Sequence, residues 1–248
     1  NGAFAPAVAQ ASGYVDLASL GWNTRLLEAQ GLDRALFPAL VDTWGPIGDA
    51  RIEGLSGTSL LCAIIADQQA AQIGHGAEAR GQIKATLGTS ATVSLSTGTE
   101  FMWRGGTIPP FIQDSVAGQT RFCLEGMVNT AGAAVDWLRR TFSLGDQVQF
   151  AALLEGSPDS GGVAFLPALQ GLGAPYGDLT RRGGLTGLSL ASTPEHVARA
   201  GVEGVAFRVR EVFDHLLAQT GTTPPEALRV DGGLTGSDGL MQALADSL

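Results

Sequence analysis

The sequence predicts an α/β protein, and two observations carry that prediction. Short segments rich in Val, Ile, Leu and Thr alternate along the 248 residues with segments whose apolar residues recur at helical spacing. Hydrophobic residues make up 44% of the composition and charged residues 16%, so a sizeable core can form. No repeat, coiled coil or low-complexity segment interrupts the alternation, and we therefore expect one or two compact domains.

The elements predicted in the first half of the chain are short. The stretch "LGWNTRLLEAQGL" predicts a helix that is capped by Asn23 or Thr24 and ended by Gly31. The apolar run from Leu60 to Ala66 is long enough for a buried strand, and a helical pattern follows it. In "GQIKATLGTSATVSLSTG", apolar and β-branched residues alternate with small polar residues on both sides of "LGTS", so we expect a hairpin with a tight glycine turn.

The second half of the chain contains longer elements. We expect a strand at "TRFCLEGMV", a helix with a small-residue first turn at "NTAGAAVDWLRRTFSLGD", and a strand at "GGVAFL" followed by a glycine- and proline-rich loop. A long amphipathic helix is predicted from Pro194, with Thr193 as its cap and Gly221 at its end. The last segment, "ALRVDGGLTGSDGLMQALADSL", predicts a strand, two glycines and a helix. A single antiparallel hairpin is expected among these alternating elements.

Charge and hydropathy exclude two classes of partner. The formal net charge is −9 and only 15 residues are Lys or Arg, whereas nucleic acid and anionic membrane surfaces require clustered cations. The longest apolar runs have the length of a strand, so no membrane span is predicted. Cys62 and Cys123 lie in apolar stretches and are expected to be buried thiols of a cytoplasmic protein. The chain has no initiator Met and stops in a helical pattern, so we expect a longer protein truncated at both ends.

A carboxylate and two amides end the first apolar run, in "ADQQAAQIGHG". One interpretation is that Asp67 caps a helix, since good helix formers follow it and a glycine ends the pattern. The other is that Asp67 stands at the carboxyl end of a parallel strand, where ligands of open α/β sheets bind. The two interpretations are compatible, and this segment alone leaves both open.

Three glycine turns are candidates for anion binding: "LGTS" at 87–90, "TAGAA" at 130–134 and "VDGG" at 230–233. Glycine lets backbone N–H groups approach a phosphate, and a helix N-terminus adds a favourable dipole. Each turn taken alone is more simply an ordinary tight turn, and none matches the Walker or dinucleotide pattern. The three histidines have no Cys or carboxylate at ligand spacing, so no metal site built from side chains is expected.

The order of these motifs resembles the FGGY carbohydrate kinases, and most closely the glycerol kinases among them. The segments that carry the resemblance are "ADQQAAQIGHG", "KATLGTSATVSLSTG", "LEGMVNTAGAAVDWLRR", "FLPALQGLGAPYGD", "RGGLTGLSLASTPEHVARAGVEGVAF" and "LRVDGGLTGSDGLMQALAD", in family order. The resemblance implies a pair of actin-like, ribonuclease-H-type domains that flank a nucleotide cleft. On that map residues 1–79 end the first, substrate-side domain, and residues 80–248 form the second, nucleotide-side domain, incomplete at its C-terminus.

Site residues follow from the resemblance position by position. Asp67 is similar to the family's catalytic base and Gln68 to the substrate-binding residue beside it, and Mg²⁺ would lie near Asp67. Thr89 corresponds to the threonine that contacts the terminal phosphates of ATP. The other residues that the resemblance places around the nucleotide are Gly88, Gly132, Asp136, Gly233 and Ser237. Phosphoryl transfer asks a protein mainly to position an acceptor hydroxyl, take its proton and stabilise phosphate charge, and these residue types suit those tasks.

The chain departs from the glycerol kinase pattern at several positions. Asp136 stands where those kinases often have Gln, and Ser237 where they often have Asn, which changes the donors available to base or ribose. Ser90 and Thr92 replace a glycine and an aromatic residue near the hairpin turn, and Gly201 replaces a larger residue of the second family signature. These departures bear on the acceptor and on nucleotide contacts rather than on the kinase chemistry.

The function predicted from the sequence is ATP-dependent phosphorylation of a small polyol or sugar, with glycerol as acceptor and Mg²⁺ as cofactor. Two alternatives stay open: a kinase of another acceptor such as a pentulose, and an actin-like module that binds nucleotide without phosphorylating anything. A homo-oligomer is compatible with the sequence. Residues 1–248 alone are expected to be inactive, because the resemblance assigns the opposite wall of the cleft to other residues.

Overall fold

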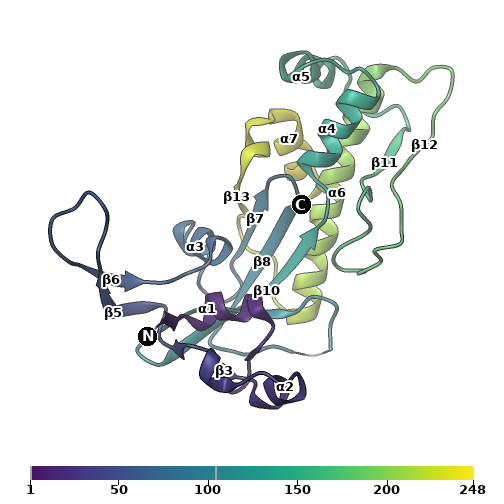
Figure 1. The fold of residues 1–248 in the computed structure, drawn as a ribbon. Coiled ribbons are helices and arrows are strands. Elements are labelled where there is room, and N and C mark those ends of the chain that lie inside the picture. The colour runs from purple at the N-terminus through teal and green to yellow at the C-terminus, as the bar shows by residue number, and fades with distance from the viewer. Residues whose placement is uncertain (1, 104) are drawn as a thin grey trace. The chain divides into compact units, whose positions relative to one another are not determined.

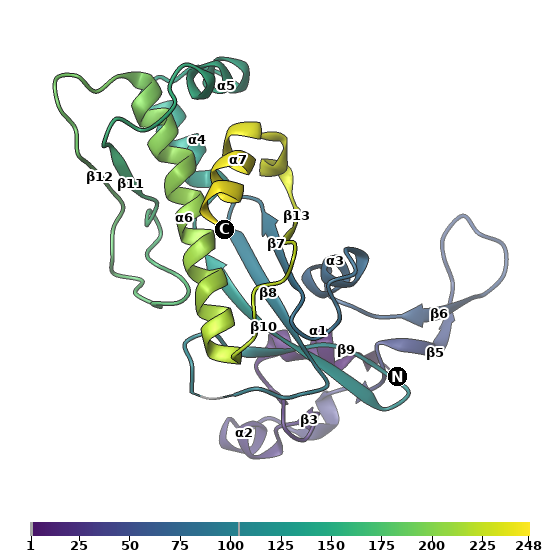
Figure 2. The ribbon, with the colours of Figure 1, turned by 180° about the vertical axis from the view of Figure 1, so that it is seen from behind.

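The computed structural model describes residues 2–103 and 105–248, and the chain forms two compact units (Figures 1 and 2). Unit 1 consists of Asn1–Gln82, Leu95–Trp103 and Pro109–Leu124. Unit 2 consists of Ile83–Ser94, Arg104–Ile108 and Glu125–Leu248. The boundary falls within two strands, β8 (Ala91–Gly98) and β10 (Gln119–Val128), so each unit is built from separate parts of the chain. The division between family domains after residue 79 stays a prediction.

Unit 1 is made mostly of short elements. They are β1 (Ala3–Phe4), α1 (Pro6–Ala9), η1 (Gln10–Ser12), β2 (Val15–Asp16), β3 (Gly21–Trp22), α2 (Thr24–Ala29), η2 (Arg34–Leu36), β4 (Ala39–Leu40), β5 (Trp44–Ala50), β6 (Ser59–Ala63), α3 (Asp67–Gly74) and β9 (Pro110–Val116). Ala7 of α1, Ile112 of β9 and Phe122 of β10 form a buried cluster. The side chain of Gln10 donates to the carbonyl of Ile112 at 2.8 Å and accepts from its N–H at 2.6 Å. The N-terminal segment is thereby held to a strand that follows it by about a hundred residues.

Unit 2 contains the longer elements. Besides parts of β8 and β10 they are β7 (Ile83–Leu87), α4 (Gly132–Thr141), α5 (Gln147–Glu155), β11 (Ala164–Leu166), β12 (Gly184–Thr186), α6 (Pro194–Thr220), β13 (Arg229–Asp231), η3 (Gly233–Gly236) and α7 (Asp238–Ser247). The main sheet has the strand order β13–β7–β8–β10–β9, with β13 parallel to β7. Helix α6 packs against α4, α5, α7 and β11 (Figures 1 and 2). Its buried face, rich in Val and Ala, forms much of the core of this unit.

Several predicted elements are confirmed at their expected limits. Helix α2 follows Asn23, whose side chain accepts from the N–H of Leu26 at 3.1 Å. Helix α6 begins at Pro194 and ends before Gly221, which adopts a left-handed conformation with φ of 68°. The hairpin of β7 and β8, the strand β10, the small-residue start of α4 and the final strand and helix are also present. The capping residues and terminal glycines in the sequence therefore predicted these helix boundaries correctly.

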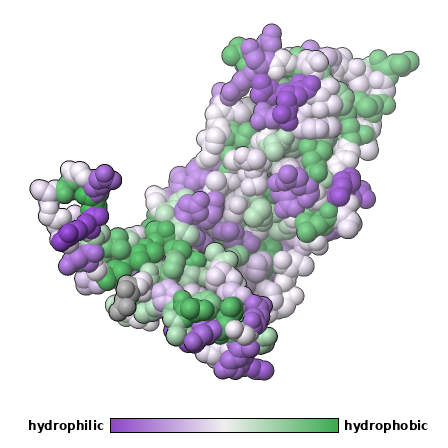
Figure 3. Space-filling model, viewed as in Figure 1, coloured by the Kyte–Doolittle hydropathy of each residue, from purple (hydrophilic) through white to green (hydrophobic). Residues whose placement is uncertain are grey.

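The predicted buried strand from Leu60 to Ala66 is wrong in two respects. Only Ser59–Ala63 forms a strand, β6, and it pairs antiparallel with β5 in a two-stranded sheet. Leu60 is 58% exposed, Cys62 is exposed as well, and apolar residues lie at the surface along β5 and β6 (Figure 3). The physical reason is that two paired strands lack the second layer that buries an apolar face. Cys123, in contrast, is buried as predicted.

Most of the short elements of unit 1 were not predicted from the sequence, and neither were β9, β12 and α5. Strand β9 begins at Pro110, in a stretch for which no strand was predicted, and proline is tolerated there because it is the first residue of the strand. Strand β12 lies in the predicted loop and is held by antiparallel pairing with β11. Helix α5 begins with a capping box between Asp146 and Gln149. The expectation of a single antiparallel hairpin is therefore wrong, since β9 with β10 and β11 with β12 are also antiparallel pairs.

Two glycines in α6 allow close packing against its neighbours. A Cβ atom at Gly201 would lie 2.7 Å from Cδ1 of Leu138 in α4, which explains why a larger residue is absent there. A Cβ atom at Gly204 would overlap the carbonyl oxygen of Phe165 in β11. A leucine side-chain end can move aside, whereas a strand carbonyl cannot without disturbing its pairing. Gly204 is therefore the more demanding of the two positions.

We expect Gly204→Ala to lower the free energy of unfolding by about 1 to 3 kcal/mol, the range typical of overpacked cores. An alanine inside an exposed helix would normally be favourable by up to about 1 kcal/mol, so the sign of the change is diagnostic. Denaturant unfolding of the variant measures the effect. Gly184→Ala in β12 is the matched control, because a Cβ atom there meets nothing within 4 Å. Equal stability of the two variants would contradict the packing argument.

Candidate nucleotide and acceptor sites

The hairpin turn after β7 and the first turn of α4 are joined through their backbones. The N–H of Gly132 donates to the carbonyl of Gly88 at 2.9 Å, and the N–H groups of Ala131 and Ala133 donate to the carbonyl of Thr89 at 2.9 and 3.1 Å. A Cβ atom at Gly132 would lie 2.8 Å from the oxygen of Gly88. The lack of a side chain at Gly132 is thus explained by the hairpin turn, and its N–H is already engaged there.

The two glycines of "VDGG" have different surroundings. Gly232 has a φ of 98°, and a Cβ atom there would overlap the backbone of Leu87 at the end of β7. Gly233 has neither constraint, and a Cβ atom there meets nothing within 4 Å. Gly232 is therefore required by the local backbone, whereas Gly233 borders open space.

A buried ion pair joins the strands that carry these two turns. The Nζ atom of Lys84, whose side chain is 1% exposed, lies 3.3 Å from Oδ2 of Asp231. Lys84 belongs to β7 and Asp231 to β13, and the two strands run parallel in register. Because a buried lysine requires a partner, this pair favours the register in which Gly88 and Gly233 follow neighbouring strand ends.

The three turns line one cavity, which we call the turn cavity, of about 530 Å³. Its lining residues are Gly88, Thr89, Gly132, Ala133, Asp136, Arg140, Gly233 and Leu234. Thr89, Asp136 and Arg140 are exposed there, which presents a hydroxyl, a carboxylate and a guanidinium to the space. A cavity with glycine backbone on its walls and a nearby cation is suited to an anionic ligand.

A second cavity, the helix cavity, has a volume of about 540 Å³ and shares Asp136, Gly233 and Leu234 with the first. Its apolar walls include Val135, Phe150, Leu154, Val202 and Leu240, and its polar residues include Arg139, Gln147, Ser237 and Gln242. The guanidinium carbon of Arg139 lies 5.9 Å from the ring centre of Phe150. Apolar walls with a few polar groups are typical of pockets for small organic ligands.

Phe150 and Gln147 are lining residues that the sequence analysis missed, because α5 was not predicted. A signal for them was present. Asp146 followed three positions later by Gln149 is a capping-box pattern, and the structure forms that box with two hydrogen bonds of 2.9 Å. The apolar residues after it form the helix that brings Phe150 to the cavity wall.

Asp67 is the first residue of α3 in unit 1, and Ala66 occupies the cap position. The prediction that Asp67 is the cap is therefore wrong by one residue, since Asp67 is the first helical residue. The parallel-strand interpretation is wrong because β6 is antiparallel and ends at Ala63. Oδ1 of Asp67 accepts from the N–H of Gln68 at 2.8 Å, and the side chain is exposed. A carboxylate in the first turn is stabilised by the helix dipole.

The structure thus brings together the six residues predicted around the nucleotide. Gly88, Thr89 and Gly132 line the turn cavity, Ser237 lines the helix cavity, and Asp136 and Gly233 line both. Asp67 and the half-buried Gln68 belong to the other unit. The binding and catalytic roles of all eight residues stay predictions.

His196 and His215 each take part in a side-chain hydrogen bond. Nδ1 of His196 accepts from the N–H of Thr193 at 3.2 Å at the start of α6, and Nε2 of His215 lies 3.1 Å from the hydroxyl of Thr107. Within residues 2–103 and 105–248, no group of three or more His, Cys, Asp or Glu side chains is placed to hold a metal ion. Among those same residues, no helix has the length and apolar character needed to cross a membrane.

Comparisons with known proteins agree on one family. Residues 83–248 match the C-terminal domain of the FGGY family of carbohydrate kinases. The glycerol kinases of Thermus brockianus and Rhodospirillum rubrum are each 38% identical, over 94% and 93% of this chain and 47% of their own length. The crystal structure of Plasmodium falciparum glycerol kinase with ADP superposes with a TM-score of 0.91 at 26% identity, covering 99% of this chain and 49% of that one. The chain spans about half the length of the relatives it matches.

Proposed function

Since this chain belongs to the FGGY family of carbohydrate kinases, we propose that it forms part of an enzyme that transfers the terminal phosphoryl group of ATP to glycerol. Its fold is the α/β, actin-like fold of that family, as the sequence predicts. The observation that carries the proposed acceptor is the 38% identity to glycerol kinases along 94% of the chain. A pentulose acceptor and a non-catalytic nucleotide sensor are not favoured by those relatives.

ATP is proposed to occupy the two adjoining cavities of unit 2. Its phosphates would lie in the turn cavity, where Gly88 and Gly233 place no side chain in the space and Thr89 and Arg140 offer donors. Its base would lie in the helix cavity, where Phe150 supplies an aromatic wall and Ser237 a hydroxyl. Asp136 lines both cavities and would lie near the ribose. Two cavities that share a wall, one polar and one with an aromatic side chain, suit a ligand with a phosphate end and a base.

Asp67 is proposed to be the general base and Gln68 a contact of the acceptor. The carboxylate of Asp67 is exposed, and its Oδ1 accepts from the N–H of Gln68 at 2.8 Å. An exposed carboxylate beside a bound acceptor can take its hydroxyl proton. In phosphoryl transfer a protein carboxylate can accept the proton of the attacking hydroxyl while that hydroxyl bonds to the phosphoryl group. The neighbouring amide of Gln68 can donate to and accept from a polyol.

Mg²⁺ is part of the same proposal, as a partner of the nucleotide. The described side chains do not form a ligand cluster for it, and Mg²⁺ in kinases is usually held by substrate phosphates, water and one or two carboxylates. Bound to the nucleotide phosphates, Mg²⁺ would neutralise part of their charge.

We further propose a cytoplasmic location, since ATP is available in the cytoplasm. We also propose that residues 1–248 alone are inactive, since the matched relatives are about twice as long.

The test is an acceptor screen with the full-length protein, ATP and Mg²⁺, in which the rate of ADP release measures turnover. We expect glycerol to give the highest kcat/KM among polyols and sugars. A pentulose that is preferred over glycerol would replace the proposed acceptor but keep the kinase. ADP binding without turnover of any acceptor would support the sensor instead.

A further inference from the structure

Helix α3, which begins with Asp67, is anchored to β9 by the segment before it and to β10 and β8 by the segment after it. Before the helix, the N–H of Ile64 donates to the carbonyl of Thr43 at 3.0 Å. Thr43 is fully buried and is fixed to β9 by its N–H, which donates to the hydroxyl of Ser115 at 3.1 Å, and by its hydroxyl, which accepts from the N–H of Ser115 at 2.9 Å. The entry to α3 is therefore anchored three residues before the proposed base.

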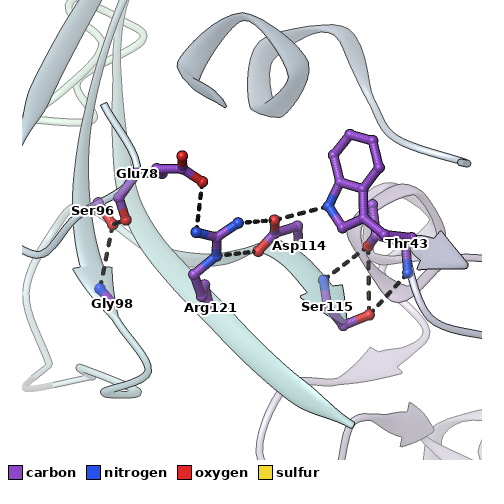
Figure 4. Close-up of polar contacts among 8 residues, drawn as sticks. Thr43, Glu78, Ser96, Gly98, Asp114, Ser115 and Arg121 are labelled. Carbon is purple, nitrogen blue, oxygen red and sulfur yellow. Dashed lines mark hydrogen bonds and ion pairs between the residues drawn. The ribbon is translucent and has the colours of Figure 1, made fainter. Parts of the chain in front are cut away.

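The exit from α3 is anchored through Glu78, four residues after the helix ends. Its carboxylate lies 2.6 Å from Nη1 of Arg121 in β10, and its carbonyl accepts from the hydroxyl of Ser96 at 2.8 Å. Figure 4 shows the guanidinium of Arg121 between the carboxylates of Glu78 and Asp114. One arginine thus connects the segment after α3 to the neighbouring strand.

Asp114 of β9 connects the two anchors to each other. Its side chain is fully buried, and Oδ1 accepts from Nε of Arg121 at 2.7 Å while Oδ2 accepts from Nη2 of the same arginine (Figure 4). Oδ2 also accepts from Nε1 of Trp44, the residue after Thr43, at 3.0 Å. The pKa of Arg121 is raised by its bond to Asp114, so the guanidinium stays charged. A two-pronged arginine–carboxylate pair has a fixed geometry.

We propose that Glu78 and Arg121, together with Asp114, are positioning residues that orient α3 and so aim the carboxylate of Asp67. The inference rests on the proposed role of Asp67 as general base. The network reaches α3 from both sides but includes neither Asp67 nor a residue of either nucleotide cavity. It should therefore affect the rate of transfer without affecting ATP affinity.

Glu78 is the residue to change, because its side chain is 39% exposed and its loss leaves the Arg121–Asp114 pair intact. Removing Arg121 would take the cationic partner away from the buried carboxylate of Asp114, which is strongly destabilising. In the full-length protein we expect Glu78→Ala to lower kcat about 10-fold with an unchanged KM for ATP, since small misplacements of catalytic groups can cost up to about 100-fold. Glu78→Gln, which keeps an oxygen for Arg121, should recover most of the rate.

The decisive measurement is a double-mutant cycle with Asp67→Asn. If Glu78 acts through Asp67, Glu78→Ala should cost less than about 2-fold once the base is absent. Equal losses in both backgrounds, or no loss of kcat in the first, would overturn the positioning role. Normal turnover of Asp67→Asn itself would instead overturn the base assignment, so the two failures are distinguishable.

Glu100→Ala is the matched control for this cycle. It removes an ion pair between Glu100 and Arg80, which belong to the same unit, and Arg80 lies two residues after Glu78. The side chain of Arg80 is 58% exposed and that of Glu100 is 44% exposed. An exposed pair of this kind contributes little to stability. The control should leave kcat unchanged relative to each background, with and without the Asp67→Asn substitution alike.

Discussion

Asp67→Asn in the full-length protein should lower kcat by about 10²- to 10⁴-fold, the usual range for loss of a general base, and leave nucleotide affinity nearly unchanged. Asparagine keeps the size of the side chain and can still accept from the N–H of Gln68, but it cannot take a proton from the acceptor. The residues proposed to bind ATP belong to unit 2, whereas Asp67 belongs to unit 1. The Asn variant should therefore lose kcat and keep its affinity for the nucleotide.

Steady-state ADP release and calorimetric titration with ADP measure the two quantities. Glu195→Gln is the matched control, because Glu195 is also a carboxylate in the first turn of a helix, α6, and has no proposed catalytic role. Its neutralisation removes a favourable interaction with the helix dipole and should leave kcat unchanged. Turnover of the Asn variant close to that of the unchanged protein would reduce Asp67 to a residue that stabilises α3.

Gly88→Val and Gly233→Val should each weaken ATP binding by about 10- to 100-fold, or roughly 1.4 to 2.8 kcal/mol, because the added side chain would block the close approach of a phosphate. The two glycines line the turn cavity, and neither is required by its backbone: a Cβ atom at Gly88 meets only the oxygen of Ser90, at 3.6 Å, and one at Gly233 meets nothing within 4 Å. The added side chain would therefore occupy the cavity rather than disturb the fold. The KM for the acceptor should change little.

The contrast with Gly232 makes this experiment specific. Gly232→Ala should lower the free energy of unfolding by at least about 1 to 3 kcal/mol, because of its positive φ and the overlap with Leu87. Thermal unfolding and calorimetry on all three variants separate the two kinds of glycine. A folded Gly88 or Gly233 variant with unchanged ATP affinity would show that the phosphates lie elsewhere.

Local signals in the sequence were sufficient for the limits of α2 and α6, because a capping side chain, an N-terminal proline and a terminal glycine act within a few residues of the boundary. The capping box of α5 was equally local and was overlooked. Strand β12 is different, since three residues become a strand only by pairing with β11. The exposure of β6 likewise depends on which layers surround it, and a seven-residue apolar pattern contains no such information.

In the candidate site, too, some features were predictable from the sequence and others depend on residues that are distant in it. That Gly88, Gly132 and Gly233 lie around one site was implied by the family resemblance, and the structure places all three on the wall of one cavity. What the sequence could not separate was the reason for each glycine: Gly132 admits the carbonyl of Gly88, whereas Gly233 borders open space. The distinction depends on backbone atoms that are distant in sequence. The network around Arg121 depends on side-chain geometry in the same way.

The hydrogen bonds between Gln10 and Ile112 have a consequence for how the chain folds during synthesis. At about 5 to 20 residues per second, a ribosome needs roughly 5 to 20 seconds to extend the chain from one partner to the other. Throughout that interval the apolar residues of α1 lack the strand on which they pack. Contacts between such distant residues form slowly because a long loop must close first. The segment that contains α1 therefore stays without its packing partner until β9 has been synthesised.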